Sequence, residues 1–281
     1  MRLAVLSDIH GNFIALRAVL DAIDRDNPDR VIIAGDVINR GPRSRECLAC
    51  VLDRIERDCW LCIKGNHEDY VLMAAAQDPA MMQPWQRAAL AHTFWTADRV
   101  RDLLPTVAAL PDQISLWGPD GSEVRFVHAS MRGNREGLYH HMDEAALIER
   151  TSPPADVLVA GHTHIPFSRR VDGRLIVNAG AAGLPFDGDF RPSYAILEWT
   201  PRGWTTHIRR ITYDRAAAER DMVDSGFLDG GGPMARLILE ELRSARPLLA
   251  RWQRDFEPRV CAGLMTVEDS VDALLDSIGA R

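Results

Sequence analysis

Short apolar runs alternate with amphipathic stretches over the first part of the chain. Residues 3–7 and 31–34 are apolar runs of strand length. A further helix is expected after Ser44, which has the side chain of an N-cap, and a strand is expected at 59–63. Strands that alternate with helices in this way predict a parallel sheet. The first helix is expected at 12–25, where one helical face carries Phe13, Leu16, Leu20 and Ile23.

The spacing of the apolar runs changes in the middle of the chain. Helices are expected at 68–77 and 84–96, and the apolar runs that follow are short and separated by turn residues. Short strands joined by turns indicate a second, partly antiparallel sheet. The pattern therefore predicts an α/β fold in which two mixed sheets pack face to face with helices outside. The strands of this second group are expected at 124–127, 157–160, 175–178, 194–199 and 204–211.

The pattern becomes wholly helical after about Tyr213, with a glycine-rich break at 229–233. We predict one domain over residues 1–212 and a C-terminal helical extension over residues 213–281, packed on or beside it. Its helices are expected at 214–225, 234–256 and 266–278. An apolar stripe on the extension indicates packing onto the core, and contact with a second copy or a partner is the alternative. The stripe consists of Leu237, Leu239, Leu242, Leu248 and Leu249.

Polar side chains that can bind metal ions follow several of the apolar runs. In an open α/β sheet, the loops after the strands form the edge where ligand sites lie. Carboxylate, amide and imidazole donors without cysteine suit a pair of divalent first-row metal ions. Such a pair holds the attacking and leaving oxygens of a displacement at phosphorus. The sequence therefore predicts a phosphoesterase whose site contains Asp8, His10, Asp36, Asn66, His67, His128, His162 and His164.

Five sequence blocks occur in the order DIH, GDxxxRG, GNHE, a lone VH and GHTH. This order resembles the calcineurin-like metallophosphoesterases over roughly residues 1–200, and within them the bacterial branch related to diadenosine tetraphosphatases and serine/threonine protein phosphatases. The resemblance implies a four-layer α/β/β/α sandwich as the catalytic domain. It also implies two divalent metal ions per chain (Mn, Fe, Zn, Ni or Co), with a hydroxide between them that attacks phosphorus.

The resemblance also assigns a role to each residue of these blocks. Asp36 is expected to bridge both metal ions through its two carboxylate oxygens. One ion is expected to be bound in addition by Asp8, His10 and His164. The other ion is expected to be bound by Asn66, His128 and His162.

Two residues of the blocks are expected to act on the substrate. Arg40 matches the family's phosphate-contacting arginine, since a guanidinium holds two phosphoryl oxygens at once. His67 matches the histidine that lies above the metal ions and assists the leaving group. Arg132 and Arg135 are further candidates for substrate contact.

The sequence departs from the protein phosphatases at Asn39, where they have an aspartate that pairs with the acid histidine. An amide orients His67 but does not raise its pKa by charge as a carboxylate does. Good leaving groups are therefore favoured, and we expect hydrolysis of small phosphodiesters or dinucleoside polyphosphates. A serine/threonine-type protein phosphatase is the alternative. A non-catalytic binding module on the same fold is a remote alternative, because none of the metal-binding or acid positions has been lost.

The remaining histidines and polar motifs are interpreted without a catalytic role. Glu68 and Asp69 are expected to be carboxylates of a helix N-terminus, favoured by the helix dipole. The glycine-rich segment 178–183 resembles one that closes over the site in this branch, and a tight turn explains its glycines equally well. Surface or structural positions are expected for His92, His140, His141 and His207.

Composition and cysteine content narrow the class of protein. The 281 residues have a net charge of −7, which argues against a general nucleic-acid or membrane surface. No apolar run approaches the length of about 18 residues that a membrane span needs. Five cysteines, an odd number, suit a reducing compartment, so a cytoplasmic protein with a small phosphate-ester or nucleotide substrate is expected. Buried thiols rather than a zinc site are expected for Cys47, Cys50, Cys59 and Cys62.

Overall fold

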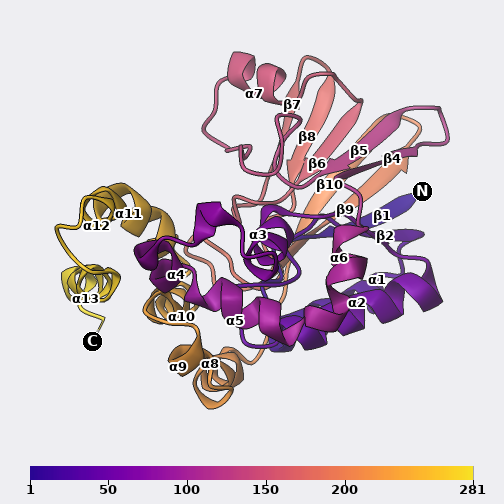
Figure 1. Cartoon of the computed structure of the whole chain (residues 1–281). Coiled ribbons are helices and arrows are strands. Elements are labelled where there is room, and N and C mark those ends of the chain that lie inside the picture. The colour runs from indigo at the N-terminus through magenta and orange to yellow at the C-terminus, as the bar shows by residue number, and fades with distance from the viewer. Residues whose placement is uncertain (281) are drawn as a thin grey trace.

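A computed structural model of the chain describes residues 1–280 and contains two five-stranded sheets (Figure 1). The first sheet has the strand order β10-β9-β1-β2-β3. Strands β1, β2 and β3 are parallel, and β9 runs antiparallel to both β1 and β10. The strands are β1 (Arg2–Leu6), β2 (Arg30–Ile33), β3 (Leu61–Cys62), β9 (Ser193–Thr200) and β10 (Gly203–Arg210).

The second sheet has the strand order β4-β5-β6-β8-β7. Its three central strands are parallel, and the two edge strands pair antiparallel to their neighbours. Neither edge strand was predicted, because polar residues interrupt the apolar ones in both strands and most of their side chains are partly or fully exposed. The strands are β4 (Gln113–Trp117), β5 (Glu123–Val127), β6 (Val157–Ala160), β7 (Phe167–Val171) and β8 (Arg174–Asn178).

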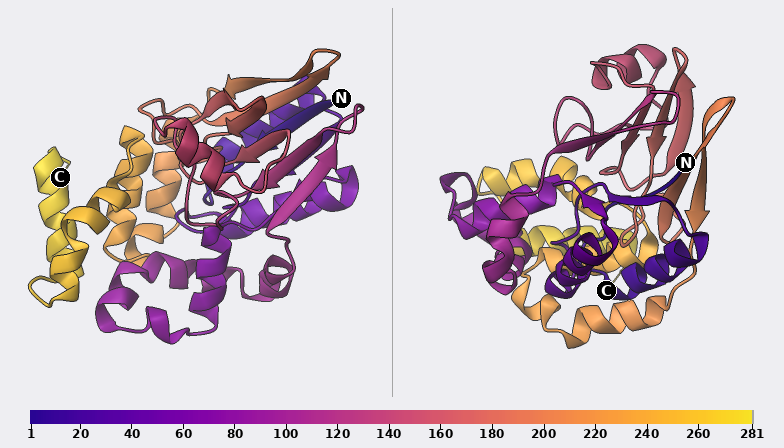
Figure 2. Two further views of the ribbon diagram at one scale, coloured as in Figure 1. Left: turned by 90° about the horizontal axis from the view of Figure 1, so that it is seen from above. Right: turned by 90° about the vertical axis from the view of Figure 1, so that its right-hand side faces the viewer.

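The two sheets pack face to face and helices cover their outer faces, as predicted (Figure 2). Successive residues of β1 point to opposite sides, since side chains alternate along a strand. Leu3 and Val5 belong to the cluster between the sheets, with Phe126 of β5 and Val177 of β8. Alternate residues of the same strand pack under helices on the outside. These helices are α1 (Phe13–Asp26), α2 (Ser44–Asp58), α3 (Asn66–Ala75) and α5 (Ala91–Arg99).

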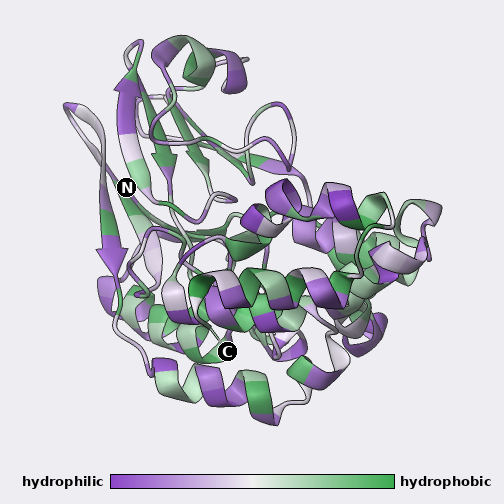
Figure 3. Ribbon diagram, turned by 90° about the vertical axis from the view of Figure 1, so that its left-hand side faces the viewer, coloured by the Kyte–Doolittle hydropathy of each residue, from purple (hydrophilic) through white to green (hydrophobic). Residues whose placement is uncertain are grey.

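The outer face of the second sheet carries a smaller cluster. Leu158 and Ile176 of the sheet pack there with Leu147 of helix α7 (Glu144–Arg150) and with Leu138. The result is the four-layer α/β/β/α sandwich that the resemblance implied. Figure 3 shows hydrophobic and hydrophilic residues alternating along the outer helices, which is the pattern of helices with one buried face.

The C-terminal helices pack beside α5 and α4 (Pro84–Ala89), at one end of the first sheet (Figures 1 and 2). Phe227, Leu237 and Trp252 of these helices share a buried cluster with Trp95 of α5. The predicted packing of the apolar stripe is thus observed, whereas the domain boundary at residue 212 stays a prediction. The helices are α8 (Arg215–Asp224), α9 (Phe227–Gly230), α10 (Met234–Ser244), α11 (Leu248–Asp255), α12 (Glu257–Cys261) and α13 (Val267–Ile278).

Several predicted boundaries were wrong. The helix expected at 234–256 ends at Ser244, because the next residue, Ala245, has a left-handed backbone, and Pro247 precedes the next helix. The helix expected at 84–96 is divided at Leu90. Ser44 is the first residue of α2 rather than its N-cap, which is Arg43, and the Ser44 hydroxyl accepts a hydrogen bond from the backbone N–H of Asn39 at 3.0 Å.

The cysteines differ in their burial. Cys47 and Cys62 are buried, but Cys59 is exposed because it ends α2 in a left-handed conformation, so the expectation of four buried thiols was wrong. None of the cysteines lies in a cluster of potential metal ligands within residues 1–280. No helix in this described part of the chain has the length and apolarity needed to span a membrane.

Candidate metal centre

Loops at the carboxyl ends of β1, β2, β3, β5 and β6 bring the predicted metal ligands together. Asp8 and Asp36 follow neighbouring parallel strands, and the backbone N–H of Asp8 donates to the carbonyl of Gly35 at 3.1 Å. The backbone N–H of His10 donates to the carbonyl of Asp36 at 3.0 Å. Asp8, Asp36 and His164 have positive φ angles of 56°, 56° and 58°. Such backbone costs of order 1–3 kcal/mol per residue and persists at functional sites where the surrounding structure enforces it.

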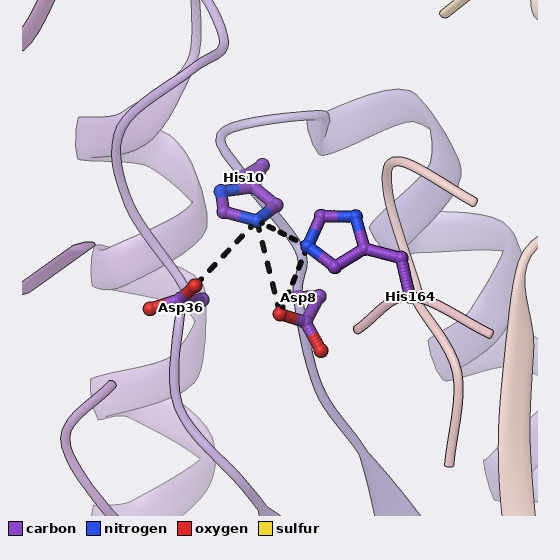
Figure 4. A group of neighbouring side chains, drawn as sticks. All are labelled: Asp8, His10, Asp36 and His164. Carbon is purple, nitrogen blue, oxygen red and sulfur yellow. Dashed lines mark hydrogen bonds and ion pairs between the residues drawn. The ribbon is translucent and has the colours of Figure 1, made fainter. Parts of the chain in front are cut away.

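One group of donors consists of Asp8, His10, Asp36 and His164 (Figure 4). The Nε2 atoms of His10 and His164 lie 3.1 Å apart. His164 Nε2 is 3.2 Å from Asp8 Oδ1, and His10 Nε2 is 3.6 Å from Asp36 Oδ2. Two carboxylates and two imidazoles thus face one point, and all four side chains are buried.

A second group consists of Asp36, His128 and His162. His128 Nε2 lies 3.3 Å from Asp36 Oδ2. Asn66 Oδ1 is 2.9 Å from both His128 Nε2 and His162 Nδ1, so the amide oxygen faces the same point. Asp36 belongs to both groups, which is the arrangement expected of a carboxylate that bridges two ions.

The hydrogen bonds around the two groups leave several ligand atoms available to bind metal ions. His128 Nδ1 lies 2.8 Å from the carbonyl of Ala34, and His164 Nδ1 lies 2.5 Å from the carbonyl of Leu184. In the neutral form of each ring, an Nδ1–H that donates to the carbonyl leaves Nε2 unprotonated toward the site, as in metal-binding histidines. The buried Oδ1 atom of Asp8 accepts no hydrogen bond within the described residues. A divalent cation at each point would satisfy these lone pairs.

The protonation states of Asp36, His10 and His162 also suit metal binding, since ligands must bind in their deprotonated forms. Burial acts to lower the pKa of His128, but the neighbouring Asp36 raises it to about 10, so His128 must lose a proton when a metal ion binds. Burial lowers the pKa of His10 well below its usual value and lowers that of His162 to about 4. Burial acts to raise the pKa of Asp36, but the neighbouring His128 and His67 hold it well below its usual value. Asp36 is therefore ionised, and His10 and His162 are neutral near pH 7.

His67 lies above the first group, with its ring 4.8 Å from that of His10. The Asn39 side chain fixes its orientation. Asn39 Oδ1 accepts a hydrogen bond from the backbone N–H of Arg40 at 2.9 Å, which identifies the other amide atom as nitrogen. That nitrogen donates to His67 Nδ1 at 3.0 Å and to Thr93 Oγ1 at 3.1 Å. His67 Nδ1 is therefore an acceptor, and the ring proton is on Nε2.

Glu68 has a larger role than its position in the sequence predicted. Its carboxylate is 1% exposed and accepts backbone N–H hydrogen bonds from Asp36, Val37, Ile38 and Gly65 at 2.8, 2.8, 3.2 and 2.7 Å. It thus holds the loop that carries Asp36 against the loop that carries Asn66. The helix-dipole interpretation missed this because the partners lie about 30 residues away in the sequence.

Replacing Glu68 with alanine is expected to lower the free energy of unfolding by about 3 kcal/mol, because it leaves several buried N–H groups without an acceptor. Denaturant unfolding of the metal-free protein measures this loss. Asp69→Ala is the matched control, because Asp69 is half-exposed and pairs with Lys64 near the surface. Its expected effect is within about 1 kcal/mol. Equal effects of the two substitutions would contradict the role given to Glu68.

The other predicted residues lie at different distances from the centre. Arg132 pairs with Glu149 on the surface, which gives no support for substrate contact. Arg135 lies over the Tyr70 ring at 4.8 Å and lines the cleft described below. Gly183 passes so close to the backbone of Ile9 that a Cβ atom there would lie 1.8 Å from the Ile9 carbonyl oxygen. A glycine at position 183 is therefore required by close packing against the DIH loop.

The remaining histidines are divided between the surface and the interior. Burial lowers the pKa of His92 to about 3, and His92 lies in the same helix as Thr93, so it is a neutral interior residue. His140, His141 and His207 are exposed. These positions agree with the interpretation of all four as surface or structural residues.

A cleft of about 740 Å³ opens from the metal centre. This volume lies in the range of small-molecule sites, about 300–1,000 Å³. Asn66, His67 and Arg40 line its inner end. The outer wall comes from α4 and the C-terminal helices, which the sequence did not place near the site. The wall residues include Trp85, Met234, Leu249, Trp252 and Gln253.

Comparison with known proteins identifies the family. A family model described as the calcineurin-like phosphoesterase superfamily domain matches residues 1–201. The chain is 26% identical to phosphodiesterase YfcE of Escherichia coli over 204 residues, which cover 70% of this chain and 88% of that protein. It is 36% identical over 102 residues to a symmetrical bis(5'-nucleosyl)-tetraphosphatase of Paracidovorax citrulli, covering 35% of this chain and 34% of that protein.

A solved structure supports the same family assignment. A metallophosphoesterase from Sphaerobacter thermophilus superposes with a TM-score of 0.68 at 26% identity, covering 87% of this chain and all of that one. The chain therefore belongs to the calcineurin-like phosphoesterase superfamily, and it is a phosphate-ester hydrolase. The predicted family is confirmed, whereas the role of each site residue stays a prediction.

Proposed function

We propose that this phosphoesterase hydrolyses small phosphodiesters or phosphoanhydrides, including dinucleoside polyphosphates, with two divalent metal ions. Asp36 is the residue proposed to bridge the ions. When bound, such ions lower the pKa of water and neutralise phosphoryl oxygens. Asp8, His10 and His164 would hold one ion, and Asn66, His128 and His162 the other. Mn, Fe, Zn, Ni and Co all accept these donors.

The protein side chains have separate tasks in the proposed reaction. Arg40 lines the cleft beside the centre, where its guanidinium can bind two phosphoryl oxygens of the substrate. His67 presents Nε2–H, from which the leaving oxygen receives a hydrogen bond as the ester bond breaks. The walls of the cleft restrict access of water and hold the remainder of the substrate. Positioning and electrostatic stabilisation thus supply most of the rate enhancement.

The hydrogen bond from the Asn39 amide to His67 Nδ1 is the observation that most directly supports substrates with good leaving groups. A carboxylate at this position would accept a hydrogen bond from Nδ1–H and stabilise the imidazolium, which is the stronger acid. The amide instead favours the neutral ring. The same observation weighs against a protein phosphatase, because the serine and threonine alkoxides are poor leaving groups.

A substrate panel tests this proposal. Purified protein is loaded separately with each of the five metals and assayed with an aryl phosphodiester, a dinucleoside tetraphosphate and a phosphoserine peptide. We expect kcat/KM to be highest for the first two substrates and lowest for the peptide. A higher kcat/KM for the peptide would replace the proposal with a protein phosphatase. Protein that binds these compounds without hydrolysing any of them would instead support a non-catalytic module.

A further inference from the structure

A buried glutamate of the C-terminal helices lies beside the proposed phosphate-binding arginine. Glu241 of α10 is fully buried, with 0% of its surface exposed. Its Oε1 atom accepts a hydrogen bond from the backbone N–H of Leu249 at 2.8 Å. Its Oε2 atom accepts no hydrogen bond within the described residues and lies 3.7 Å from Arg40 Nη1. One carboxylate therefore contacts both the start of α11 and the guanidinium.

Arg40 has few other means of fixing its side chain. Its backbone is left-handed, with a φ of 61°, as is that of Asn39 before it. Within residues 1–280, Glu241 is the one carboxylate within 4.0 Å of its guanidinium. The ring of Phe186 lies 5.9 Å from the guanidinium carbon and stacks on His164 at 4.2 Å. Arg40 thus lies between a proposed metal ligand and the C-terminal helices.

The geometry allows Glu241 to orient the Arg40 guanidinium without occupying the N–H groups that would bind phosphate. A separation of 3.7 Å is longer than a hydrogen bond, so Glu241 attracts the guanidinium while the N–H groups stay available for phosphoryl oxygens. Burying a carboxylate is costly, and a neutral amide oxygen would satisfy the Leu249 N–H equally well. The charge of Glu241 is therefore best explained by Arg40.

A second contact joins the same loop to the C-terminal helices. The guanidinium of Arg43 donates from Nε to Oδ1 and Oδ2 of Asp221 in α8, at 2.8 and 3.0 Å. Arg43 lies three residues after Arg40, so both ends of this short segment contact the extension. Between them, a small cavity of about 20 Å³ is lined by Arg40, Asp221 and Ile238. The extension is therefore continuous with the wall of the site.

We propose that Glu241 is a positioning residue, through which the C-terminal helices hold the Arg40 guanidinium in place to receive the phosphoryl group. This inference rests on the proposed function, because it takes Arg40 as the phosphate-binding residue. It makes the extension a part of the active site. It also predicts that the effect of Glu241 depends on the presence of Arg40.

A double-mutant cycle tests this dependence. Glu241→Gln keeps an oxygen for the Leu249 N–H and removes the charge, and it is made both in wild type and in Arg40→Ala. Two quantities are measured on metal-loaded protein: the Kd of inorganic phosphate by calorimetry, and kcat/KM for an aryl phosphodiester. In the wild-type background we expect both to worsen about tenfold, within the range for contacting residues. In the Arg40→Ala background we expect changes of less than about twofold.

Controls separate positioning from loss of structure. Glu240→Gln removes the preceding carboxylate of α10, which pairs with Arg243 on the surface, and is expected to change neither quantity by more than about twofold. If Glu241→Gln does not fold, Glu241→Asp, which withdraws the charge by one methylene, takes its place in the cycle. Metal content and melting temperature are recorded for every variant.

The outcomes are distinct. Equal losses from Glu241→Gln in both backgrounds would show a structural role and overturn the proposal. No loss in the wild-type background would also overturn it, provided that Arg40→Ala itself weakens phosphate binding. If wild type hydrolyses no phosphate ester, the proposed function fails, whereas the calorimetric cycle with phosphate still decides whether Glu241 acts through Arg40.

Discussion

Replacing Asp36 with asparagine is expected to remove the second metal ion and to lower kcat by at least about 10³, in the range of removing one key electrostatic group. Asp36 Oδ2 faces His10 at 3.6 Å and His128 at 3.3 Å, so the same carboxylate belongs to both groups of donors. The asparagine side chain has nearly the same size as aspartate but no charge. Its amide nitrogen donates hydrogen bonds, whereas the carboxylate oxygen that it replaces accepts them. Steady-state kinetics and elemental analysis of the metal-loaded variant measure the two effects.

Asp21→Asn is the matched control, because Asp21 is an exposed carboxylate of α1 far along the helix from the site loop. Its metal content and kcat are expected to equal those of wild type. The Asp36 backbone also accepts hydrogen bonds from the DIH loop, so circular dichroism should confirm that the variant is folded. An Asp36→Asn variant with near-normal turnover would contradict the bridging role.

The second large effect concerns the leaving group. His67→Ala is expected to lower kcat/KM by about 10² or more for substrates with poor leaving groups, as for loss of a general acid. For aryl phosphodiesters, whose leaving oxygen needs little protonation, the loss is expected to be below about tenfold. A series of esters of increasing leaving-group pKa, assayed with both proteins, gives the comparison. If the logarithm of kcat/KM changes with leaving-group pKa by the same slope in both proteins, His67 does not assist the leaving group.

Asn39→Asp tests the partner of His67 in the same series. The carboxylate would accept a hydrogen bond from His67 Nδ1–H and stabilise the imidazolium, which is the better proton donor. We therefore expect faster hydrolysis of esters with poor leaving groups and little change for good ones. Thr93→Val serves as a control, since it removes the other partner of the Asn39 amide without adding charge. A uniform loss of activity with Asn39→Asp would argue that the amide has only a structural role.

Much of the fold follows from local patterns in the sequence. The buried strands β1, β2 and β6 are apolar apart from the arginine that begins β1 and β2, because both of their faces are covered, so their positions could be predicted. The edge strands β4 and β7 could not, since solvent lies on much of their surface and polar residues are tolerated there. The side chains that cluster at the candidate metal centre could also be picked out from the sequence, because each directly follows or lies near a recognisable apolar run, whereas their roles as ligands stay predictions.

The parts of the site that the sequence did not predict depend on contacts between distant segments. Glu68 looks like an ordinary carboxylate at a helix N-terminus, and only the fold places the backbone of Asp36 against it. Glu241 lies about 200 residues from Arg40 in an amphipathic helix, where a glutamate usually faces solvent. The cleft has the same origin, since its wall combines α4 with the C-terminal helices.

If two metal ions act together in this site, full activity requires two bound ions per chain, which a metal titration measures. Metal-free protein is titrated with Mn²⁺ while bound metal and hydrolysis of an aryl phosphodiester are measured in the same samples. We expect no activity without metal and a plateau of activity at two bound ions per chain. A plateau at one bound ion or fewer, or full activity in the metal-free protein, would rule out catalysis by two metal ions.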